Sequence, residues 1–475
     1  MSTFGGLHTA YSGLAAARAA MDVTGQNIAN ATTAGYTRQR VTQESIGATG
    51  AGASIFVNGT GVGTGVSVTG IQRIDDQMVD QRLRSATASS SYWSVASGAM
   101  DTVESSLGEP SETGISATLG DFWASWQNLA NNPTLPSAGN ALLAQASQLT
   151  AQISTGYQTA SADWSQARDA ASATVARINE TAGRIAQLNT AIRVTVAGGG
   201  SANELIDQRA TFLTSLSGLT GATVRSNSDS TVDVIVGGYT MVGTGSARQL
   251  TIAGASTLVS AAGSPVRVEW ADKPGVTVEV DGGALAGSLT SLAPAAAGGS
   301  GGPFAEAAAL YNTLATSLAT KVNAVHSTGS TASGMTGLAF FSFTAGAPAA
   351  VGLTLVPTSL SGIAAGSAGS GAANGSIADA IGRIGQATDG PDVIWSDFVV
   401  SVGSQTRNAA VQATLTGATL TTATTAQTSQ NSVDLDEETT NLITFQHAYQ
   451  GAARMMTAVD EMLDVLINRT GLVGR

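Results

Sequence analysis

Apolar side chains recur at seven-residue intervals at both ends of this chain of 475 residues. Near the N-terminus the large members of the repeat are Leu7, Leu14, Met21 and Ile28, and a small residue follows three positions after each. Near the C-terminus two apolar rows run through four heptads, namely Leu442, Tyr449, Met456 and Leu463, and Phe445, Ala452, Val459 and Leu466. Such spacing is typical of helices that pair along an apolar seam, although the C-terminal segment alone also fits an ordinary amphipathic surface helix. We therefore expect the terminal helices to pair as an antiparallel coiled coil, an inner domain of residues 1–35 and 434–475.

The same seven-residue spacing also occurs in the middle of the chain. One such run extends from Val79 to Leu107. Another extends from Trp164 to Ile192, within a longer helical stretch of residues 142–196. Helices of that length indicate an elongated bundle rather than a compact sphere. Ser201 and the glutamate three residues later have the spacing of a capping box and predict another helix as far as residue 219. Residues 304–325 are again helical in pattern, so we expect a helical middle domain of residues 36–221 and 301–433.

Between these helical stretches the hydrophobic period changes to two. Val232, Val234 and Val236 occupy alternate positions, and two valine-rich runs, 266–270 and 276–280, flank residues 272–275 (DKPG) as in a β-hairpin. We expect residues 222–300 to form a small outer β domain. The predicted fold class is therefore mainly α with a β insertion.

Two further segments have weaker patterns. Residues 327–380 consist mostly of Gly, Ala, Ser and Thr, and this composition predicts a loop-rich, mobile part of the middle domain. Residues 404–432 are polar and rich in Thr. We expect them to be helical only if they pack against the long helices.

Composition excludes several classes of function. The chain has no Cys, so a disulfide framework, a thiolate nucleophile and a Cys-ligated metal are excluded. Its net charge is −12 without any block of Lys and Arg, which argues against binding nucleic acid or an anionic membrane surface. No run of about 20 apolar residues could form a membrane-spanning helix, and no cleavable secretory signal is readable at the N-terminus.

None of the candidate chemical motifs fits a reactive site. The alternating glycines of residues 59–65 lack the spacing of a phosphate loop, and we interpret them as a turn that leads into a strand at 66–69. The three histidines, His8, His326 and His447, form no close metal-binding pair, and no Gly-x-Ser-x-Gly motif is present. The acidic cluster at 434–438 lacks the ligand spacing of a calcium loop and fits the start of a helix. We therefore predict no catalytic, cofactor-binding or metal-ligating residue, and no cofactor.

The N-terminal region contains a motif that points to a family. Residues 11–17 read YSGLAAA, residues 27–30 read NIAN, and residues 35–40 read GYTRQR. The motif residues are Asn27, Ile28, Ala29, Asn30, Gly35 and Tyr36. This stretch resembles the axial proteins of the bacterial flagellum, although Ala34 stands where those proteins usually have a proline.

Four further segments narrow the resemblance to the FlgK family of flagellar hook-associated proteins. They are residues 36–41 (YTRQRV), residues 68–73 (VTGIQR), residues 203–209 (NELIDQR) with the glycines before Tyr239, and residues 441–449 (NLITFQHAY) with 453–456. The resemblance covers about residues 1–300 and 395–475. It extends only loosely over the Gly/Ala-rich region between them.

The resemblance implies a structural junction protein rather than an enzyme. Such a protein assembles at the distal end of the hook and connects it to the filament through the next junction protein. The implied partners are copies of itself in a helical ring, hook protein, a second junction protein of the FlgL type, and an export chaperone of the FlgN type on the C-terminal helix. The implied location is extracellular, on the flagellum, after export through the flagellar type III system.

Other functions remain open on the sequence alone. Another flagellar axial protein, of the hook or rod type, is the alternative within the same class. An extracellular adhesin or enzyme carried on a flagellin-like scaffold is the alternative from a different class.

Overall fold

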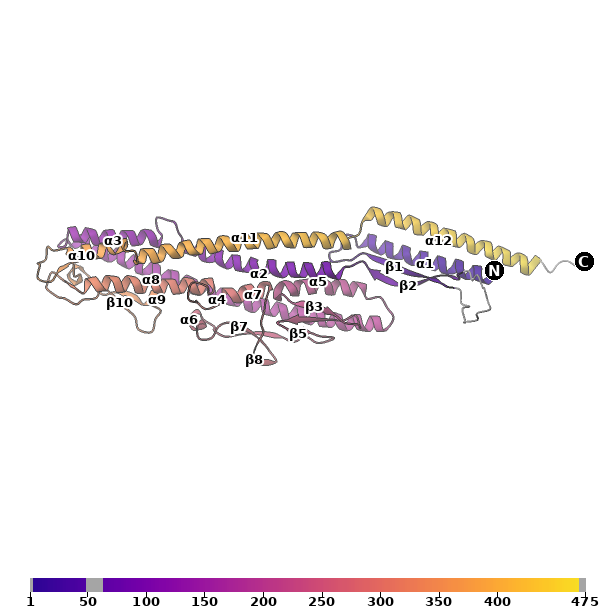
Figure 1. Cartoon of the computed structure of the whole chain (residues 1–475), viewed down its shortest axis with the longest axis horizontal. Helices are drawn as coiled ribbons and strands as arrows, with labels where there is room; N and C mark the ends of the chain where they lie inside the picture. The colour runs from indigo at the N-terminus through magenta and orange to yellow at the C-terminus, as the bar shows by residue number, and fades with distance from the viewer. Residues whose placement is uncertain (1–2, 48–62, 470–475) are drawn as a thin grey trace, which may run out of the picture.

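The computed structural model describes residues 3–47 and 63–469. The molecule is elongated, and the two described ends of the chain lie at the same end of it (Figure 1). Most residues are helical, and the strands form small separate sheets. The prediction of a mainly helical fold with a β insertion is therefore confirmed. In the part of the chain that the structure describes, no helix is both long and apolar enough to cross a membrane.

Four long helices run along the part of the molecule that we call the body (residues 74–433). They are α2 (Gln77–Leu107), α4 (Pro136–Ala197), α8 (Pro303–His326) and α11 (Pro391–Asn431). α4 alone has 62 residues, which corresponds to about 93 Å at the usual helical rise. Proline stands in the first turn of α4, α8 and α11, where its missing N–H would have no helical partner in any case. The helices predicted over 79–107, 142–196 and 304–325 are all present.

α5 (Asn203–Thr220) does not begin as the sequence predicts. Its N-cap residue is Ala202, and no side chain caps the first turn, so the capping box predicted at Ser201 is wrong. Glu204 instead faces β1 (Gln39–Ile46), where its carboxylate accepts a hydrogen bond of 3.4 Å from the Gln39 side chain. The acidic residue of the motif therefore joins two elements instead of capping its own helix.

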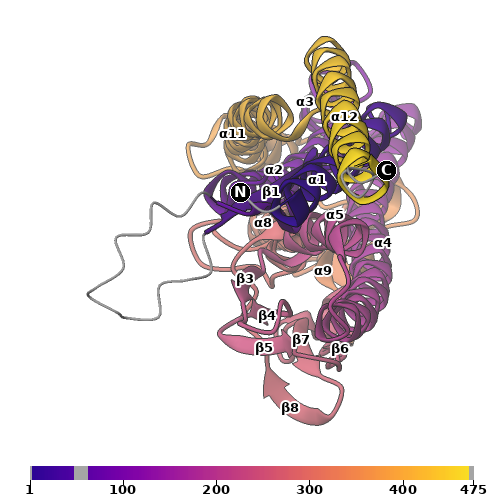
Figure 2. The same ribbon diagram turned by 90° about the vertical axis from the view of Figure 1, so that its right-hand side faces the viewer.

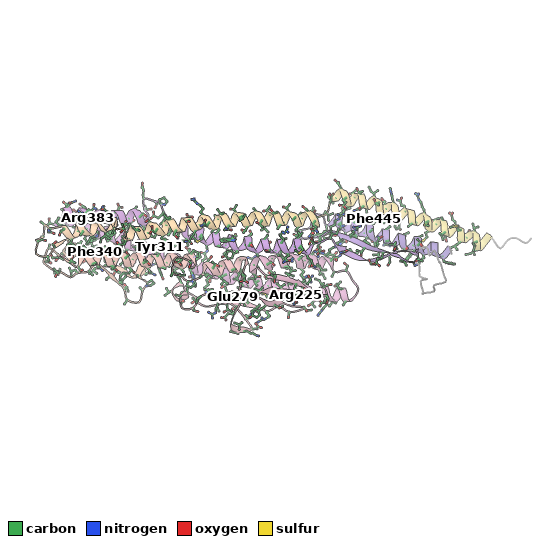
Figure 3. All side chains as sticks on the ribbon, in the orientation of Figure 1. Arg225, Glu279, Tyr311, Phe340, Arg383 and Phe445 are labelled. Carbon is green, nitrogen blue, oxygen red and sulfur yellow. The ribbon has the colours of Figure 1, made fainter. Side chains whose placement is uncertain are left out.

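The core at one end of the body is aromatic. α3 (Ile115–Asn131) contributes Phe122 and Trp126, which pack against Phe340 at ring-centroid distances of 6.4 and 4.9 Å. Further along the body, Tyr311 of α8 packs against Trp395 of α11 at 5.6 Å. Figure 3 shows Phe340 and Tyr311 in this half of the molecule, far from the terminal helices.

α4 and α8 approach each other closely at Gly156. A β-carbon at this position would overlap the ring of Tyr311, which is buried beside Trp395. We expect Gly156→Ala to lower the free energy of unfolding by about 1–3 kcal/mol, although Ala favours helix over Gly by up to about 1 kcal/mol.

Gly183→Ala on the same helix is the matched control, because nothing lies within 4 Å of its added β-carbon. This variant should keep or raise the free energy of unfolding. Urea denaturation of both variants measures the difference, and a Gly156→Ala protein as stable as Gly183→Ala would contradict the close approach.

Two three-stranded antiparallel sheets cover one side of α4 and α5 (Figure 2). The first contains β3 (Thr223–Ser226), β4 (Val232–Val236) and β5 (Tyr239–Val242), and the second contains β6 (Leu250–Ala253), β7 (Arg267–Trp270) and β8 (Lys273–Thr277). Val232, Val234 and Val236 are buried, as their alternation predicts. They share an apolar cluster with Ile185 of α4 and Leu216 of α5, so the sheets and these helices have one core.

The β7–β8 hairpin is present, but its turn lies earlier than predicted. Trp270 pairs with Lys273, so residues 273–275 belong to β8 rather than to the loop. A register irregularity next to Trp270 and a φ of 87° at Gly275 accommodate this arrangement. The segment also contains helices that its strand pattern did not predict, α6 (Leu258–Ala261) and α7 (Gly283–Ser291), and α7 packs on α2.

The Gly/Ala-rich segment 327–380 is rich in loops, as its composition predicts, but several of its residues pack into the core of the body. It forms short elements: β9 (Gly329–Ser330), β10 (Phe341–Phe343), α9 (Ala349–Gly352), β11 (Leu353–Leu355), β12 (Gly366–Ser367) and most of α10 (Ser376–Gly382). Phe340 and Phe341 are buried. The Asn323 side chain of α8 donates to the Phe341 carbonyl at 2.8 Å and accepts from the Phe340 N–H at 2.8 Å. A few apolar residues and one amide therefore fix a segment whose composition alone suggests loops.

α11 includes most of the Thr-rich stretch and packs along α2, as its helical form was expected to require. Ala423 of α11 forms a small apolar cluster with Leu83 and Ala86 of α2. The threonine hydroxyls donate to backbone carbonyls of the preceding turn, for example Thr421 to Gly417 at 3.0 Å. The helix therefore satisfies its own hydroxyls and needs few apolar contacts.

The opposite end of the molecule combines one helix from each end of the chain. α1 (Thr3–Ala29) runs antiparallel to α12 (Leu435–Asp464), with Gly6 beside Val459 and Gly13 beside Ala452. α12 continues into a π-helical turn, Val465–Arg469. The antiparallel strands β1 and β2 (Gly65–Arg73) pack on α1. We call α1, α12, β1 and β2 the terminal unit; Figure 1 shows it as a slender extension of the body.

Candidate functional site

The seam between α1 and α12 is filled by the small residues of α1. Ala10, Ala17 and Thr24 are buried. The large residues predicted for this helix are only half-buried; they are Leu7, Leu14, Met21 and Ile28. The large side chains therefore flank the seam and keep surface that another molecule can cover.

The residues predicted for assembly on α12 lie along the same pair of helices. Val459 is buried, and six others are half-buried: Leu442, Phe445, Tyr449, Ala452, Met456 and Leu463. Phe445 lies toward the body end of α12 (Figure 3). Leu466 is 58% exposed and belongs to the π-helical turn. In the observed register this turn lies beyond the described start of α1, so α1 does not cover it.

Both helices carry further large apolar side chains on their open surface. Phe4 and Tyr11 of α1 are 71% and 62% exposed, and Met455 and Met462 of α12 are 54% and 55% exposed. Each pair is spaced by seven residues, so its members lie on one face of their helix. The antiparallel register places Phe4 at the level of Met462, and Tyr11 at the level of Met455. At these two levels, both helices of the terminal unit therefore present exposed apolar side chains.

Asn27 is the centre of a hydrogen-bond network at the joint between the terminal unit and the body. It is 1% exposed. Its Nδ2 donates to the Gln39 carbonyl (2.9 Å) and to Oε2 of Glu438 (3.0 Å). Its Oδ1 accepts from the Gln39 N–H (3.0 Å) and from the Tyr36 hydroxyl (2.8 Å). One fully satisfied amide therefore ties α1 to β1 and to the first turn of α12.

Arg38 connects the same joint to α12 through ion pairs with two glutamates. Its Nη2 lies 2.7 Å from Oε1 of both Glu437 and Glu438, whose side chains are 56% and 3% exposed. Hydrogen bonds from Arg38 hold the pKa of Glu437 below its usual value. The Arg38 backbone N–H also donates to the Asn431 carbonyl at the end of α11 (3.0 Å). This one residue therefore fixes the end of α11 and the beginning of α12.

Asp207 of α5 anchors the joint to the body. Its carboxylate accepts from the Thr37 N–H (3.1 Å) and from Nε of Arg73 (2.8 Å). Burial raises the pKa of Asp207 above its usual value, while Arg73 and Thr37 act in the opposite direction. Close by, Asn203 donates to the Gln39 side chain (2.9 Å). Several segments quoted for the family resemblance, 27–30, 35–41, 68–73 and 203–209, thus meet at one place.

The remaining motif residues shape the end of α1. Ile28 is half-buried and Ala29 is exposed. Asn30 donates from its side chain to the Gln26 carbonyl at 3.0 Å, and Gly35 has a φ of 80° in the turn that follows. Sequence reasoning selected Asn27 and Tyr36, assigned Glu438 only to the start of a helix, and gave no role to Arg38 or Asp207. Their charge inside motif segments was the available signal for Arg38 and Asp207.

Tyr36 provides a spectroscopic test of the joint. Burial raises the pKa of Tyr36 from 10.0 to about 12, and three nearby carboxylates add to the shift. Its folded-state pKa is raised, so its contribution to stability is complete below pH 10 and is lost as the pH rises toward about 12.

We expect the difference in tyrosinate absorbance between the wild type and Tyr36→Phe to have its midpoint near pH 12. In guanidinium chloride the same difference should titrate near pH 10. A midpoint near pH 10 in the folded protein would contradict the buried position of this phenol.

The other candidates from the sequence have structural roles. Asp434 caps α12 by accepting from the N–H groups of Asp436 (2.9 Å) and Glu437 (3.2 Å), as expected for a helix start. His326 is buried, with Nδ1 at 2.8 Å from the Leu338 carbonyl. The glycine-rich turn before β2 lies mostly outside the described residues. Within residues 3–47 and 63–469, no group of three or more His, Asp and Glu side chains could hold a metal ion.

Comparison with known proteins decides the family. The family model described as the helical domain of flagellar hook-associated protein FlgK matches residues 100–341, just over half of the chain. The chain belongs to the FlgK family. FlgK is a structural protein of the flagellar hook–filament junction, and the relatives matched here are structural flagellar proteins.

Two more family models match the two helices of the terminal unit. The flagella basal body rod protein model matches residues 7–37, and the C-terminal model of the basal body rod proteins FlgEFG matches residues 429–469. These matches support association with the axial structure of the flagellum. They cover α1 with its motif and α12 with the end of α11.

The individual relatives are also named as flagellar hook-associated or hook junction proteins. Flagellar hook-associated protein 1 of Bacillus subtilis is 29% identical over the whole of both chains. The protein of that name in Salmonella typhimurium is 32% identical over 71% of this chain and 59% of its own length. The flagellar hook junction protein FlgK from Burkholderia pseudomallei has a similar fold, with a TM-score of 0.62 at 17% identity, over 74% of this chain and all of that one.

Proposed function

We propose that the terminal unit is the part of this junction protein that builds it into the flagellum. In this proposal α1 and α12 form an inner coiled-coil domain of residues 1–35 and 434–475. Copies of it would pack around the flagellar axis in a helical ring at the distal end of the hook. β1 and β2 would stay with this inner domain, since they pack on α1. The rest of residues 36–221, with 301–433, would form the middle domain, and residues 222–300 the outer β domain.

The observation that carries this proposal is the apolar surface of the terminal unit. Phe4, Tyr11, Met455 and Met462 are each more than half exposed and lie at two matching levels. Covering a large apolar side chain contributes about 1.5–3 kcal/mol. The half-buried seam residues add further surface, so neighbouring copies of this unit would gain stability by packing together.

The partners follow from this arrangement. Hook protein would contact one side of the ring, and a second junction protein of the FlgL type would continue the structure toward the filament. The match of rod-protein models to α1 and α12 supports a packing mode that axial proteins share. We assign no catalytic role to the chain.

We further propose that the chain works outside the cell after export by the flagellar type III system. Before export, a chaperone of the FlgN type would cover the C-terminal helix. The exposed apolar side chains of α12, among them Met455 and Met462, support this role because a chaperone could cover them.

The experiment replaces two of these side chains in a strain that lacks its own copy. We expect Tyr11→Asp combined with Met455→Asp to leave hooks intact but to abolish filaments, as seen by electron microscopy. Val400→Asp on α11, where the valine is 71% exposed, is the matched control and should keep its filaments.

Three outcomes would count against the proposal. Normal filaments in the double variant would show that this surface does not assemble. Loss of the hook itself would favour a hook or rod protein. Filament loss in the Val400→Asp control would show that any added surface charge is enough.

A further inference from the structure

A pocket of about 580 Å³ lies beside the joint, between β2, α2, α5 and the β3–β4 connection. Three arginines line it: Arg73, Arg84 and Arg209. A second pocket of about 450 Å³ shares Arg84 with the first. Two carboxylates, Asp75 and Asp80, line the first pocket as well.

Arg209 forms no ion pair with another described residue, although the carboxylate of Asp229 is near enough to raise its pKa. Arg209 is 6% exposed, and its Nη1 donates to two neutral oxygens, Oδ1 of Asn189 (3.0 Å) and the Ser230 carbonyl (2.8 Å). Its Nε is buried and has no hydrogen-bond partner in the described part of the chain. Burial and the nearby Arg73 lower the pKa of Arg209 to about 10. A buried cation whose hydrogen bonds all go to neutral groups is costly unless an anion approaches it closely.

Arg84 is the second cation with unmet hydrogen-bonding capacity. It is half-buried on α2, and no hydrogen bond or ion pair joins it to another described residue. Burial lowers the pKa of Arg84, although Asp80 one turn earlier acts in the opposite direction. Its guanidinium lies between the two pockets, where a ligand in either could reach it.

The acidic residues of the pocket are already engaged. Asp75 pairs with Arg73 at 3.0 Å, and Asp80 accepts from the Gln427 side chain at 2.7 Å. Arg73 is also paired with Asp207 at 2.7 Å. Arg84 and Arg209 are therefore the arginines of the pocket without a direct ion pair among the described residues, while Asp80 and Asp229 act on them at longer range.

We propose that this pocket binds a small oxyanion, a carboxylate or phosphate group, between Arg84 and Arg209. The planar guanidinium fork suits such groups because it can donate two parallel hydrogen bonds to them. The group comes either from a free ion or from an acidic side chain of a neighbouring copy, which this acidic chain supplies in excess. The site lies next to the joint and is distinct from the apolar surface of the terminal unit.

The test uses the full-length chain and two probes, inorganic phosphate and acetate, at constant ionic strength. Calorimetric titration should show saturable binding of at least one of them. Arg84→Gln should weaken this binding at least tenfold. Arg82→Gln is the matched control, because Arg82 is exposed on the same helix and outside both pockets.

A second variant distinguishes a loss of binding from a loss of folding. Arg209→Lys keeps the charge but loses the guanidinium fork, and it should also weaken binding while the helical circular dichroism spectrum stays unchanged. Sedimentation velocity then separates the two sources of the anion. Weaker self-association of Arg84→Gln, with competition by acetate, identifies a neighbour's carboxylate, whereas unchanged self-association identifies a free ion.

Two results would overturn the proposal. One is the absence of saturable binding of either probe, together with unchanged self-association of Arg84→Gln. The other is an equal loss of binding in Arg82→Gln, which would show a general effect of surface charge.

Discussion

Replacing Arg38 with Met is expected to make local opening of α12 easier by about 3–5 kcal/mol. The Glu438 carboxylate, with a side chain only 3% exposed, would lose the cation that lies 2.7 Å away. Glu437 would lose the same partner, but its exposed position makes that loss small. Amide hydrogen exchange in the first turns of α12 measures the opening free energy directly.

Arg18→Met is the matched control for this prediction. Arg18 and Asp22 are 4.0 Å apart on α1, with side chains 73% and 75% exposed, so removing that pair should cost less than about 1 kcal/mol. Adding Glu438→Gln to Arg38→Met should restore part of the loss, since the buried group is then uncharged. Equal opening free energies in Arg38→Met and Arg18→Met would show that the joint does not depend on this ion pair.

Phe340→Ala is expected to lower the free energy of unfolding of the body by about 3–5 kcal/mol. The ring is fully buried and lies 4.9 Å from Trp126 and 5.5 Å from His326, between ring centroids. Its removal leaves a cavity that the neighbouring rings cannot fill without moving. Urea denaturation followed by tryptophan fluorescence reports this change.

The control is another phenylalanine of the same segment. Phe343 is 44% exposed on β10, and its replacement by Ala should change the free energy of unfolding by less than about 0.5 kcal/mol. If Phe340→Ala were as mild as Phe343→Ala, the segment 327–380 would contribute no core to the body.

The helices were predictable because their signal is local. Seven-residue spacing is visible within one segment, so α1, α2, α4, α8 and α12 could be predicted with nearly correct ends. The pattern also identified the residues near the α1–α12 seam. It could not show that Ala10 and Ala17 lie deepest, because that depends on how closely the two helices approach.

The joint was not predictable because its contacts join residues far apart in the sequence. Arg38 and Glu438 meet across 400 positions, and Thr37 and Asp207 across 170. The motif marked Asn27 and Tyr36, but only the fold shows that Tyr36 bonds to Asn27 and that Asn27 bonds to Gln39 and Glu438. Composition predicted the loops of residues 327–380 but could not show that Phe340 is buried there or that Asn323 of α8 bonds to its backbone.

The pairing of α1 with α12 has a consequence for incomplete copies of the chain. The body can gather its own core from residues 74–433, whereas the terminal unit needs helices from both ends. A chain that stopped before residue 435 would keep the body but would leave α1 without its partner helix. The paired surface of α1 and α12 can therefore form only in a chain that has been translated through its last helix.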